Sequence, residues 1–421
     1  MAEPASFPAR GQPTEELLEA IRELRADDAD WRGGRAFSLV YNADDAELET
    51  LHDAVGSMFL AENALNPFAF PSLRRMEAEV VAMASALVHL EGGDGSMSSG
   101  GTESIFLAVH TAREAARARG VENPSVLTAA TAHPAFAKAC HYLGLDHLRT
   151  PHGPDGRADP AAMIDALDER CALVVASAPC YPFGVIDPVA DLAAAAADRG
   201  VPCHVDACLG GWLLPFWEEI GERVPPWDFR VPGVTSLSAD IHKYGYAFKG
   251  ASVVLYRDPA MMRRQWFLYD DWPGGLYGSP TAAGTRPAAP IAGAWATIRH
   301  LGRTGYQAKA RVVRDTTLRF RNGIGAIDGL EVRHRPDLSL FEFGAAADGD
   351  GRPVLDIAGV ADVMDDRGWG LDRQEGGLHL MVSPYHAHVV DRFLADLADA
   401  VAHHDASRGR ASTYGGAPPA P

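Results

Sequence analysis

The sequence predicts an α/β protein built around a parallel sheet that helices cover on both faces. Between about residues 92 and 257, short apolar or β-rich runs alternate with windows of helical periodicity, which is the pattern of βαβ units. The chain has 421 residues, of which 47% are hydrophobic and 22% charged, as in ordinary globular domains. A chain of this length buries a large core, and ~150 residues per domain gives two or three domains.

Three helices are predicted before the alternating region, over residues 14–26, 46–60 and 72–90. The third carries apolar side chains from Leu73 to Leu90 at spacings of three and four, which places them on one helix face. We therefore expect a helical N-terminal segment ahead of the sheet.

The alternating region supplies the strands and helices of the predicted sheet. The predicted strands are 125–128, 173–177, 202–205, 235–238 and 252–256. The predicted helices are 102–119, 135–143, 160–170 and 189–199. Ligands of such folds bind beyond the carboxyl ends of the strands, so we expect the chemistry in the loops that follow the strands.

After the alternating region the chain changes character. Gly and Pro are dense over 271–290, which indicates a long functional loop, and an amphipathic helix from residue 291 leads into a second α+β pattern. The last residues form a polar Gly/Pro-rich tail. The predicted organisation is an N-terminal helical segment (1–60), a large α/β domain (61–300), a small C-terminal α+β domain (301–405) and a disordered tail (406–421).

Charge and composition exclude several classes of partner. Lys and Arg number 38 and Asp and Glu 56, so the formal net charge is −18, and nucleic acid or an anionic membrane would repel the chain. The longest charge-free run, 171–186, contains two prolines and a glycine and is shorter than the ~20 apolar residues of a spanning helix. The N-terminus has no apolar leader, and five scattered cysteines show no metal-ligand spacing. We therefore expect a cytoplasmic protein with reduced thiols, no metal and no transmembrane segment.

A glycine-rich loop opens the helix predicted at 102–119. Gly100 and Gly101 would let the backbone approach an anion closely, and the first free N–H groups of the helix would hold a phosphate. A plain capped helix with Thr102 as its N-cap explains the same residues equally well. This motif alone decides nothing.

Two candidate residues follow predicted strands. Asp206, after the run 202–205, would pair with a protonated ring nitrogen if buried, although an Asp here commonly caps a helix. Lys243, after the run 235–238, is a candidate Schiff-base lysine, because desolvation would lower its pKa and expose a nucleophilic amine. An exposed loop lysine is the simpler alternative. Ser238 and His242 flank Lys243 as potential phosphate donors.

The order of these residues favours one cofactor. His133 would stack on a planar ring, although a lone His is more often structural. A phosphate loop, a stacking His, an Asp at a strand end and a later lysine form the set that pyridoxal 5′-phosphate requires. Taken together, they favour this cofactor over the separate structural explanations.

These residues lie in segments that resemble the group II decarboxylase family of fold-type I pyridoxal-phosphate enzymes, and more closely its sphingosine-1-phosphate lyase-like members. The segments are GRAFSLVY (34–41), NALNPFAFPSLRRMEAEVV (63–81), SSGGTESIFLA (98–108), TAHPAFAKA (131–139), HVDACLGGWL (204–213), DFRVPGVTSLSADIHKYGYAFKGASVVLY (228–256) and DWPGGLYGSPTAAGTRPA (271–288). The resemblance implies a mostly parallel seven-stranded sheet with flanking helices, a small C-terminal α+β domain, and a homodimer with active sites at the subunit interface.

Carried over by position, the resemblance implies Lys243 as the Schiff-base lysine, Asp206 on the pyridine nitrogen and His133 stacked on the ring. The residues implied to hold the cofactor phosphate are Gly100, Gly101, Thr102, Ser238 and His242, and Cys208 belongs to the implied cofactor site.

Four further residues are implied to act around the substrate or across the dimer. Thr285 would reach the cofactor phosphate of the other subunit, and Tyr277 matches an active-site tyrosine that assists proton transfer. Tyr41 and Lys249 match groups that hold the phosphate of the substrate.

Two departures from the family concern substrate recognition. The family's Asn-Pro-Leu-His-Pro reads NALNP (63–67) here, so Asn66 stands where a His contributes to phosphate binding. An amide donates a hydrogen bond but carries no positive charge. Two alternatives are therefore equally favoured: Asn66 still binds the substrate phosphate, or the substrate itself has changed. Upstream, bulkier residues replace a Ser-Gly-Ala run ahead of Tyr41, and we expect Phe37 and Leu39 to line the approach. The membrane anchor of the eukaryotic lyases has no counterpart in this sequence, as expected of a bacterial-type relative.

The reaction that the resemblance favours is retro-aldol cleavage of a small phosphorylated 2-amino alcohol to an aldehyde and phosphoethanolamine. Lys243 or Tyr277 would take the β-hydroxyl proton, and Asp206 would keep the ring nitrogen protonated so that the ring accepts electrons. The alternative is decarboxylation of an amino acid at the same cofactor site. A cofactor-binding homologue without turnover is a third interpretation, which the retention of Lys243, Asp206, His133 and Tyr277 disfavours.

Overall fold

A computed structural model describes residues 6–66 and 68–409 of the chain. Its largest element is a seven-stranded sheet in the order β1-β7-β6-β5-β4-β2-β3. The strands are β1 (Asp94–Ser98), β2 (Ser125–Ala129), β3 (Asp146–Thr150), β4 (Cys171–Ser177), β5 (Cys203–Asp206), β6 (Val234–Ala239) and β7 (Ser252–Tyr256). Only β7 runs antiparallel to its neighbours among these strands, so the prediction of a mostly parallel sheet is confirmed.

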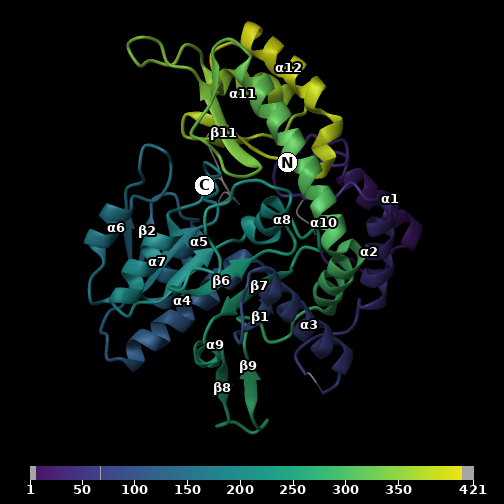
Figure 1. Cartoon of the computed structure of the whole chain (residues 1–421). Coiled ribbons are helices and arrows are strands. Elements are labelled where there is room, and N and C mark those ends of the chain that lie inside the picture. The colour runs from purple at the N-terminus through teal and green to yellow at the C-terminus, as the bar shows by residue number, and fades with distance from the viewer. Residues whose placement is uncertain (1–5, 67, 410–421) are drawn as a thin grey trace.

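Helices cover both faces of this sheet because its central strands are apolar on both sides (Figure 1). In β4, Leu173 and Val175 pack with α4 (Gly101–Ala118) and α5 (Ala135–Leu143). The alternate residues of the same strand, Val174 and Ala176, pack in a second core with α7. The remaining helices beside the sheet are α6 (Pro160–Ala166), α7 (Val189–Asp198), α8 (Leu214–Glu219) and α9 (Pro259–Gln265).

The edge strands β1 and β3 were not predicted from the sequence. Their sequences, DGSMS and DHLRT, lack the apolar runs that marked the other strands. Polar residues on sheet edges are ordinary, because they discourage pairing with other chains. These two strands are therefore specified by pairing with β7 and β2 and not by their own composition.

Four further helices precede the large sheet in the chain or connect it to the small one. They are α1 (Thr14–Leu24), α2 (Ala46–Met58), α3 (Pro71–Leu87) and α10 (Ala288–Gly325). Helix α10 contacts α2 and α3 and extends upward to the smaller sheet (Figure 1). Gly302, with φ +54°, interrupts it, so the boundary predicted at residues 300/301 falls at a kink inside one element. The domain boundaries themselves stay a prediction.

A second sheet, antiparallel and four-stranded, forms the C-terminal part in the order β10-β11-β13-β12. Its elements are β10 (Leu330–Val332), β11 (Leu340–Ala345), α11 (Ile357–Asp366), β12 (Asp372–Gln374), β13 (Gly377–Met381) and α12 (Val390–His403). Phe37 belongs to this core, where it is 1% exposed and stacks on His386. The expectation that Phe37 lines the approach to the site is therefore wrong, because the N-terminal segment crosses over to the small sheet.

A hairpin of β8 (Phe267–Tyr269) and β9 (Tyr277–Ser279) projects at the end of the molecule opposite the small sheet (Figure 1). After α12, Ser407 N donates a hydrogen bond to the Asp356 side chain, and Arg408 N donates one to the Asp362 side chain, both in the α11 region. The rest of the predicted tail, 410–421, lies outside the described residues. Among the helices that are described, none combines the length and apolar character needed to cross a bilayer.

Candidate active site

Several separate segments of the chain meet at a cavity of about 630 Å³. It lies where β5 and β6 end and α4 begins, which is the carboxyl edge of the parallel strands. The predicted residues that line it are Gly100, Gly101, Thr102, His133, Asp206, Cys208, His242 and Lys243. The structure therefore brings together most of the residues expected to hold a cofactor.

Two glycines allow the start of α4 to approach the cavity wall closely. Gly100 has φ +154°, a conformation that side chains disfavour. A Cβ on Gly101 would lie 2.7 Å from both Cys208 Sγ and Asp240 Oδ2. The N-cap is Gly100 and makes no side-chain hydrogen bond, so the alternative with Thr102 as N-cap is wrong. Because the N-cap residue provides no side-chain acceptor, the first N–H groups of this helix are available to bind an anion.

Glu103 fixes the glycine-rich loop to a distant part of the chain. One carboxylate oxygen accepts a hydrogen bond from Ser99 N (2.6 Å), and the other accepts one from Ala282 N (2.9 Å). Sequence reasoning missed this residue, although a Glu in the first turn of a helix is a known capping signal.

Asp206 is the last residue of β5 and is 7% exposed at the cavity wall. Its Oδ1 accepts a hydrogen bond from Cys208 N (3.1 Å), which orients the carboxylate. Ser238 lies behind it with no exposed surface, and its hydroxyl contacts His204 Nε2 (3.2 Å) and Cys208 Sγ (3.3 Å). Ser238 therefore supports the wall and is not among the residues that line the cavity, and its expected contact with the cofactor phosphate stays a prediction.

Lys243 forms an ion pair that the sequence argument did not foresee. Its Nζ lies 3.0 Å from Oδ2 of the buried Asp240, three residues earlier. Burial opposes the charge on Lys243, but the Asp240 carboxylate outweighs burial and raises the pKa of the lysine well above its usual value. The expected lowering of this pKa is therefore wrong in direction. The signal was present in the motif Ser-Ala-Asp-Ile-His-Lys, where an acid stands one turn before the lysine.

Two histidines at the cavity are kept neutral. Burial lowers the pKa of His133, whose Nδ1 accepts a hydrogen bond from Ala135 N (3.1 Å). Burial also lowers the pKa of His242, to about 4, although Asp240 opposes this shift. His242 Nδ1 faces Gly250 N and Ala251 N, each at 3.2 Å, so Nε2 carries the proton that it can donate to a ligand.

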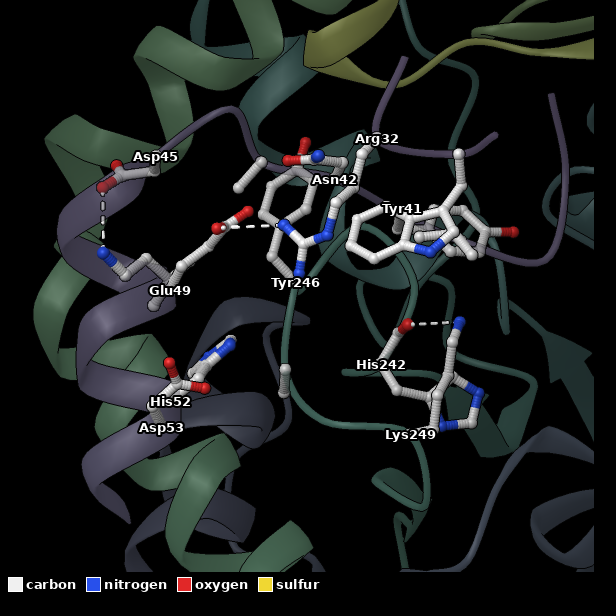
Figure 2. Close-up of a pocket in the computed structure, with 15 residues that line it drawn as sticks. Arg32, Tyr41, Asn42, Asp45, Glu49, His52, Asp53, His242, Tyr246 and Lys249 are labelled. Atoms are coloured by element: carbon white, nitrogen blue, oxygen red, sulfur yellow. Dashed lines mark hydrogen bonds and ion pairs between the residues drawn. The ribbon is translucent and has the colours of Figure 1, made fainter. Parts of the chain in front are cut away.

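A second pocket adjoins the cavity through His242, which lines both (Figure 2). Lys249 donates from Nζ to the His242 carbonyl (3.3 Å), and this ammonium lies 4.9 Å from the centre of the Tyr41 ring. The Lys249 side chain reaches solvent, but burial of its surroundings and the charge of Lys243 lower its pKa to about 8. The pair predicted to hold a substrate phosphate is therefore assembled beside the cofactor cavity.

The other predicted residues lie elsewhere in the same chain. Tyr277 is in β9, and Thr285 is exposed on the loop before α10. Asn66 lines a separate pocket beside the hairpin, and its Oδ1 accepts a hydrogen bond from Phe68 N (2.9 Å). A Cβ on Gly284 would lie 3.0 Å from Tyr277 Oη, so Tyr277 is close to the loop that carries Thr285. None of these three is among the described residues that line the cavity.

The small sheet also contributes to the cavity, which sequence reasoning missed. Asp372, the first residue of β12, lines it together with Ser38 and Leu39 of the N-terminal segment. Asp372 accepts hydrogen bonds from Ser38 Oγ (3.0 Å) and Tyr181 Oη (2.5 Å). Nothing in the local sequence distinguishes this Asp from other surface acids.

Comparison with known proteins explains this arrangement. The family described as the pyridoxal-dependent decarboxylase conserved domain matches residues 2–343. The chain belongs to the pyridoxal-dependent decarboxylase family. Its family cofactor is pyridoxal 5′-phosphate.

The relatives of this decarboxylase-family chain include lyases and decarboxylases. Sphingosine-1-phosphate lyase of Arabidopsis thaliana is 38% identical over 92% of this chain and 72% of its own length. L-aspartate/L-glutamate decarboxylase of Pyrococcus horikoshii is 30% identical over 93% of this chain and 99% of its own length. The solved structure of a sphingosine-1-phosphate lyase from Burkholderia pseudomallei is 40% identical and superposes with a TM-score of 0.89 over 95% of this chain and 93% of that chain.

The residues at the cavity fit pyridoxal 5′-phosphate. A phosphate needs close backbone donors, and a Cβ at Gly101 would fill the space beside the start of α4. An aldehyde needs an amine, and Lys243 lines the cavity. A pyridine nitrogen needs a carboxylate, and Asp206 lies at a strand end on the same wall. Among the described residues there is no group of three or more His, Cys, Asp or Glu side chains suited to a metal ion.

Proposed function

We propose that this protein is a pyridoxal-phosphate-dependent lyase that cleaves a phosphorylated 2-amino alcohol of the sphingosine-1-phosphate type to an aldehyde and phosphoethanolamine. The observation that carries the proposal is the pocket of Tyr41 and Lys249, which shares His242 with the cofactor cavity. A substrate with a phosphate near its amine would place the amine at Lys243 and the phosphate at Lys249. The sphingosine-1-phosphate lyases among its relatives support this assignment.

When bound, the cofactor supplies an electron sink for the bond that breaks. In the proposed mechanism Asp206 holds the proton on the pyridine nitrogen, and the neutral ring of His133 stacks on the cofactor. The amide groups at Gly100, Gly101 and Thr102 and the Nε2 proton of His242 hold the cofactor phosphate. The substrate amine would take the place of Lys243 on the cofactor, and either the freed Lys243 amine or Tyr277 would accept the one proton of the β-hydroxyl.

The positive charge that the family His would provide is absent at Asn66. The Lys249 ammonium supplies a charged contact to the substrate phosphate, and a charged hydrogen bond stabilises by about 1.5–3 kcal/mol. Asn66 then adds a neutral hydrogen bond or none. We expect weaker phosphate affinity than in a site with both cations, without a change of reaction.

We also propose a homodimer in which each cavity receives residues from the other copy. In one chain Tyr277, Thr285 and Asn66 lie around the projecting hairpin and away from the cavity. Large apolar side chains on this end of the molecule are exposed, namely Leu65, Phe68, Trp266, Phe267, Leu268, Trp272 and Leu276. Such a surface on a single chain favours an interface. The dimer would let the hairpin residues of one copy complete the cavity of the other.

A cytoplasmic location and a bacterial type of lyase are part of the same proposal. All five cysteines are buried and unpaired. A reducing compartment keeps them so.

The reaction is tested with two substrate classes on the cofactor-loaded protein. A phosphorylated sphingoid base should yield a long-chain aldehyde and phosphoethanolamine in equal amounts, detected by mass spectrometry. A panel of amino acids should yield no carbon dioxide. Carbon dioxide without aldehyde would replace this proposal by amino-acid decarboxylation.

A further inference from the structure

Asp372 is a carboxylate that the small sheet places on the wall of the cofactor cavity. Its side chain is 29% exposed, so one part faces the cavity and the rest is covered. The cavity of about 630 Å³ is roughly 10 Å across, which is no more than about one Debye length at 0.1 M salt. Any charged group of a bound substrate therefore senses this carboxylate.

Hydrogen bonds keep Asp372 ionised. Burial favours the neutral acid, but the neighbouring His379 and the hydroxyl donors of Tyr181 and Ser38 outweigh burial and lower the pKa of Asp372. The two hydroxyl donors are neutral, and His379 is farther away, with Nδ1 3.9 Å from Oδ2. The negative charge is thus held in place by neutral groups at hydrogen-bond distance.

The other carboxylates that line the cavity, Asp240, Glu103 and Asp206, each have partners of another kind. Asp240 is paired with Lys243 at 3.0 Å. Glu103 accepts two backbone hydrogen bonds, and Asp206 faces the proposed position of the ring nitrogen. Among the described carboxylates that line the cavity, Asp372 is the one whose partners at hydrogen-bond distance are side-chain hydroxyls, with neither a cation nor a backbone N–H group.

The positive groups that a substrate carboxylate would need are used elsewhere. None of the described residues lining the cavity is an arginine. Arg373, the next residue on β12, pairs with Asp362 (2.8 Å) and Asp365 (2.6 Å). Arg333 pairs with the buried Glu342 at 3.3 Å. Within one chain, a carboxylate on the substrate would meet Asp372 with no arginine among the described residues that line the cavity.

We infer that Asp372 is a specificity-determining residue that excludes substrates with a carboxylate on the amine-bearing carbon and so selects amino alcohols over amino acids. This inference rests on the proposed function, because it names the substrate class of the same cavity. Like charges at close range disfavour binding, whereas a hydroxyl or an ammonium can donate to an ionised carboxylate. The same residue explains how a decarboxylase-family fold would avoid amino acids.

The test uses two ligands that differ by one carboxylate, phosphoethanolamine and O-phospho-L-serine. Each is titrated into the cofactor-loaded protein, and Kd is measured from the absorbance of the bound cofactor and by calorimetry. The wild-type protein should bind phosphoethanolamine at least about tenfold more tightly. In Asp372→Asn the two Kd values should come within about threefold, because phosphoserine binds more tightly and phosphoethanolamine changes little.

Two further variants separate charge from structure. Asp372→Glu keeps the charge and should keep the wild-type ratio. Glu375→Gln removes an exposed negative charge three residues away and should also keep it. Equal wild-type affinities, an unchanged ratio in Asp372→Asn, or equal weakening of both ligands would overturn the inference. Because the ratio is a binding measurement, it holds or fails independently of aldehyde formation, which tests the proposed function.

Discussion

Asp240 sets the charge of Lys243 before any cofactor is present. Lys243 Nζ and Asp240 Oδ2 form a buried ion pair at 3.0 Å. Burial alone would raise the pKa of Asp240, but the nearby Lys243 and His242 outweigh burial and lower it. A lysine in this pair stays protonated, yet only the neutral amine attacks an aldehyde. The residue pair therefore holds the amine in position and slows loading at neutral pH.

Removing the carboxylate should make Lys243 more reactive. In Asp240→Asn the lysine keeps its burial but loses the attractive charge, so its pKa should fall by at least about one unit. The measurement is the rate of cofactor incorporation into the apoprotein as a function of pH, trapped by borohydride. The midpoint should move to lower pH in Asp240→Asn and stay unchanged in Asp240→Glu. An unmoved midpoint in the Asn variant would show that Asp240 does not control the lysine.

Lys249 gives phosphate binding a dependence on pH. Its pKa of about 8 lies below the usual value for lysine, so the ammonium is present below pH 8 and is lost as the pH rises through 8. Between pH 8 and pH 9 the protonated fraction of Lys249 falls from about a half to about a tenth, so we expect the Kd for phosphoethanolamine to increase by about fivefold as this charged contact is lost. Calorimetry from pH 6.5 to 9.5 measures this. Lys249→Met should bind weakly at every pH, and Lys249→Arg should remove the dependence by staying charged.

At the scale of elements, the start of α4 is shaped for close approach to an anion. The helix has Gly100 at its N-cap and Gly101 at its first turn, with Cys208 and Asp240 directly opposite. Gly101 is required by contact with the segments that follow β5 and β6, because a Cβ there would lie inside the normal van der Waals distance of the Cys208 and Asp240 side chains.

Gly101→Ala should therefore weaken cofactor binding. The added methyl must push α4 away from Cys208 and Asp240, which moves the N–H groups from the phosphate. We expect at least about a tenfold loss of cofactor affinity, measured by equilibrium dialysis of the apoprotein. Gly325→Ala is the matched control, since a Cβ there meets nothing within 4 Å. Equal affinity in the two variants would argue against a phosphate site at this helix.

The central elements were predictable from local patterns and the edges were not. The strands β2, β4, β5, β6 and β7 and the helices α4, α5, α6 and α7 have apolar patterns that the sequence alone reveals. Edge strands β1 and β3 are polar and depend on their neighbours. An amphipathic helix was expected from residue 291, and α10 is that helix, with a kink at Gly302.

At the scale of the whole molecule, the proposed active site is divided between two distant places. The cavity holds Lys243, Asp206 and His133, while Tyr277 and Thr285 lie at the hairpin end. The net charge of −18 concerns long-range partners only. The pocket of Tyr41 and Lys249 contains both signs of charge, with Arg32 and Lys249 facing Asp45, Glu49 and Asp53, so phosphate binding there depends on the placement of Lys249 and not on a positive region.

Mixing two inactive variants tests this division. Lys243→Ala and Tyr277→Phe should each be inactive alone. In a mixed dimer one site carries both changes and the other carries neither, so random exchange should restore about a quarter of the wild-type activity. Aldehyde formation after mixing and subunit exchange measures it, with light scattering to give the mass. No recovery in a mixture shown to contain mixed dimers would place Tyr277 and Lys243 in the same chain.

The sequence by itself determined the α/β core, the order of the central elements, the family and its cofactor, because these depend on local periodicity and on motifs a few residues long. It also placed Lys243, Asp206 and the glycine loop at strand and helix ends. It could not foresee that Ser238 is fully buried behind the cavity wall or that Phe37 packs in the core of the small sheet. The burial of these two side chains depends on tertiary packing between segments that are far apart in the sequence.

Only the tertiary structure decided the charges around the substrate. Asp240 reverses the expected pKa shift of Lys243, and Asp372 reaches the cavity from a strand more than a hundred residues away. Coulomb interactions act through space, so their effect is set by distances in the folded chain and not by separation along it.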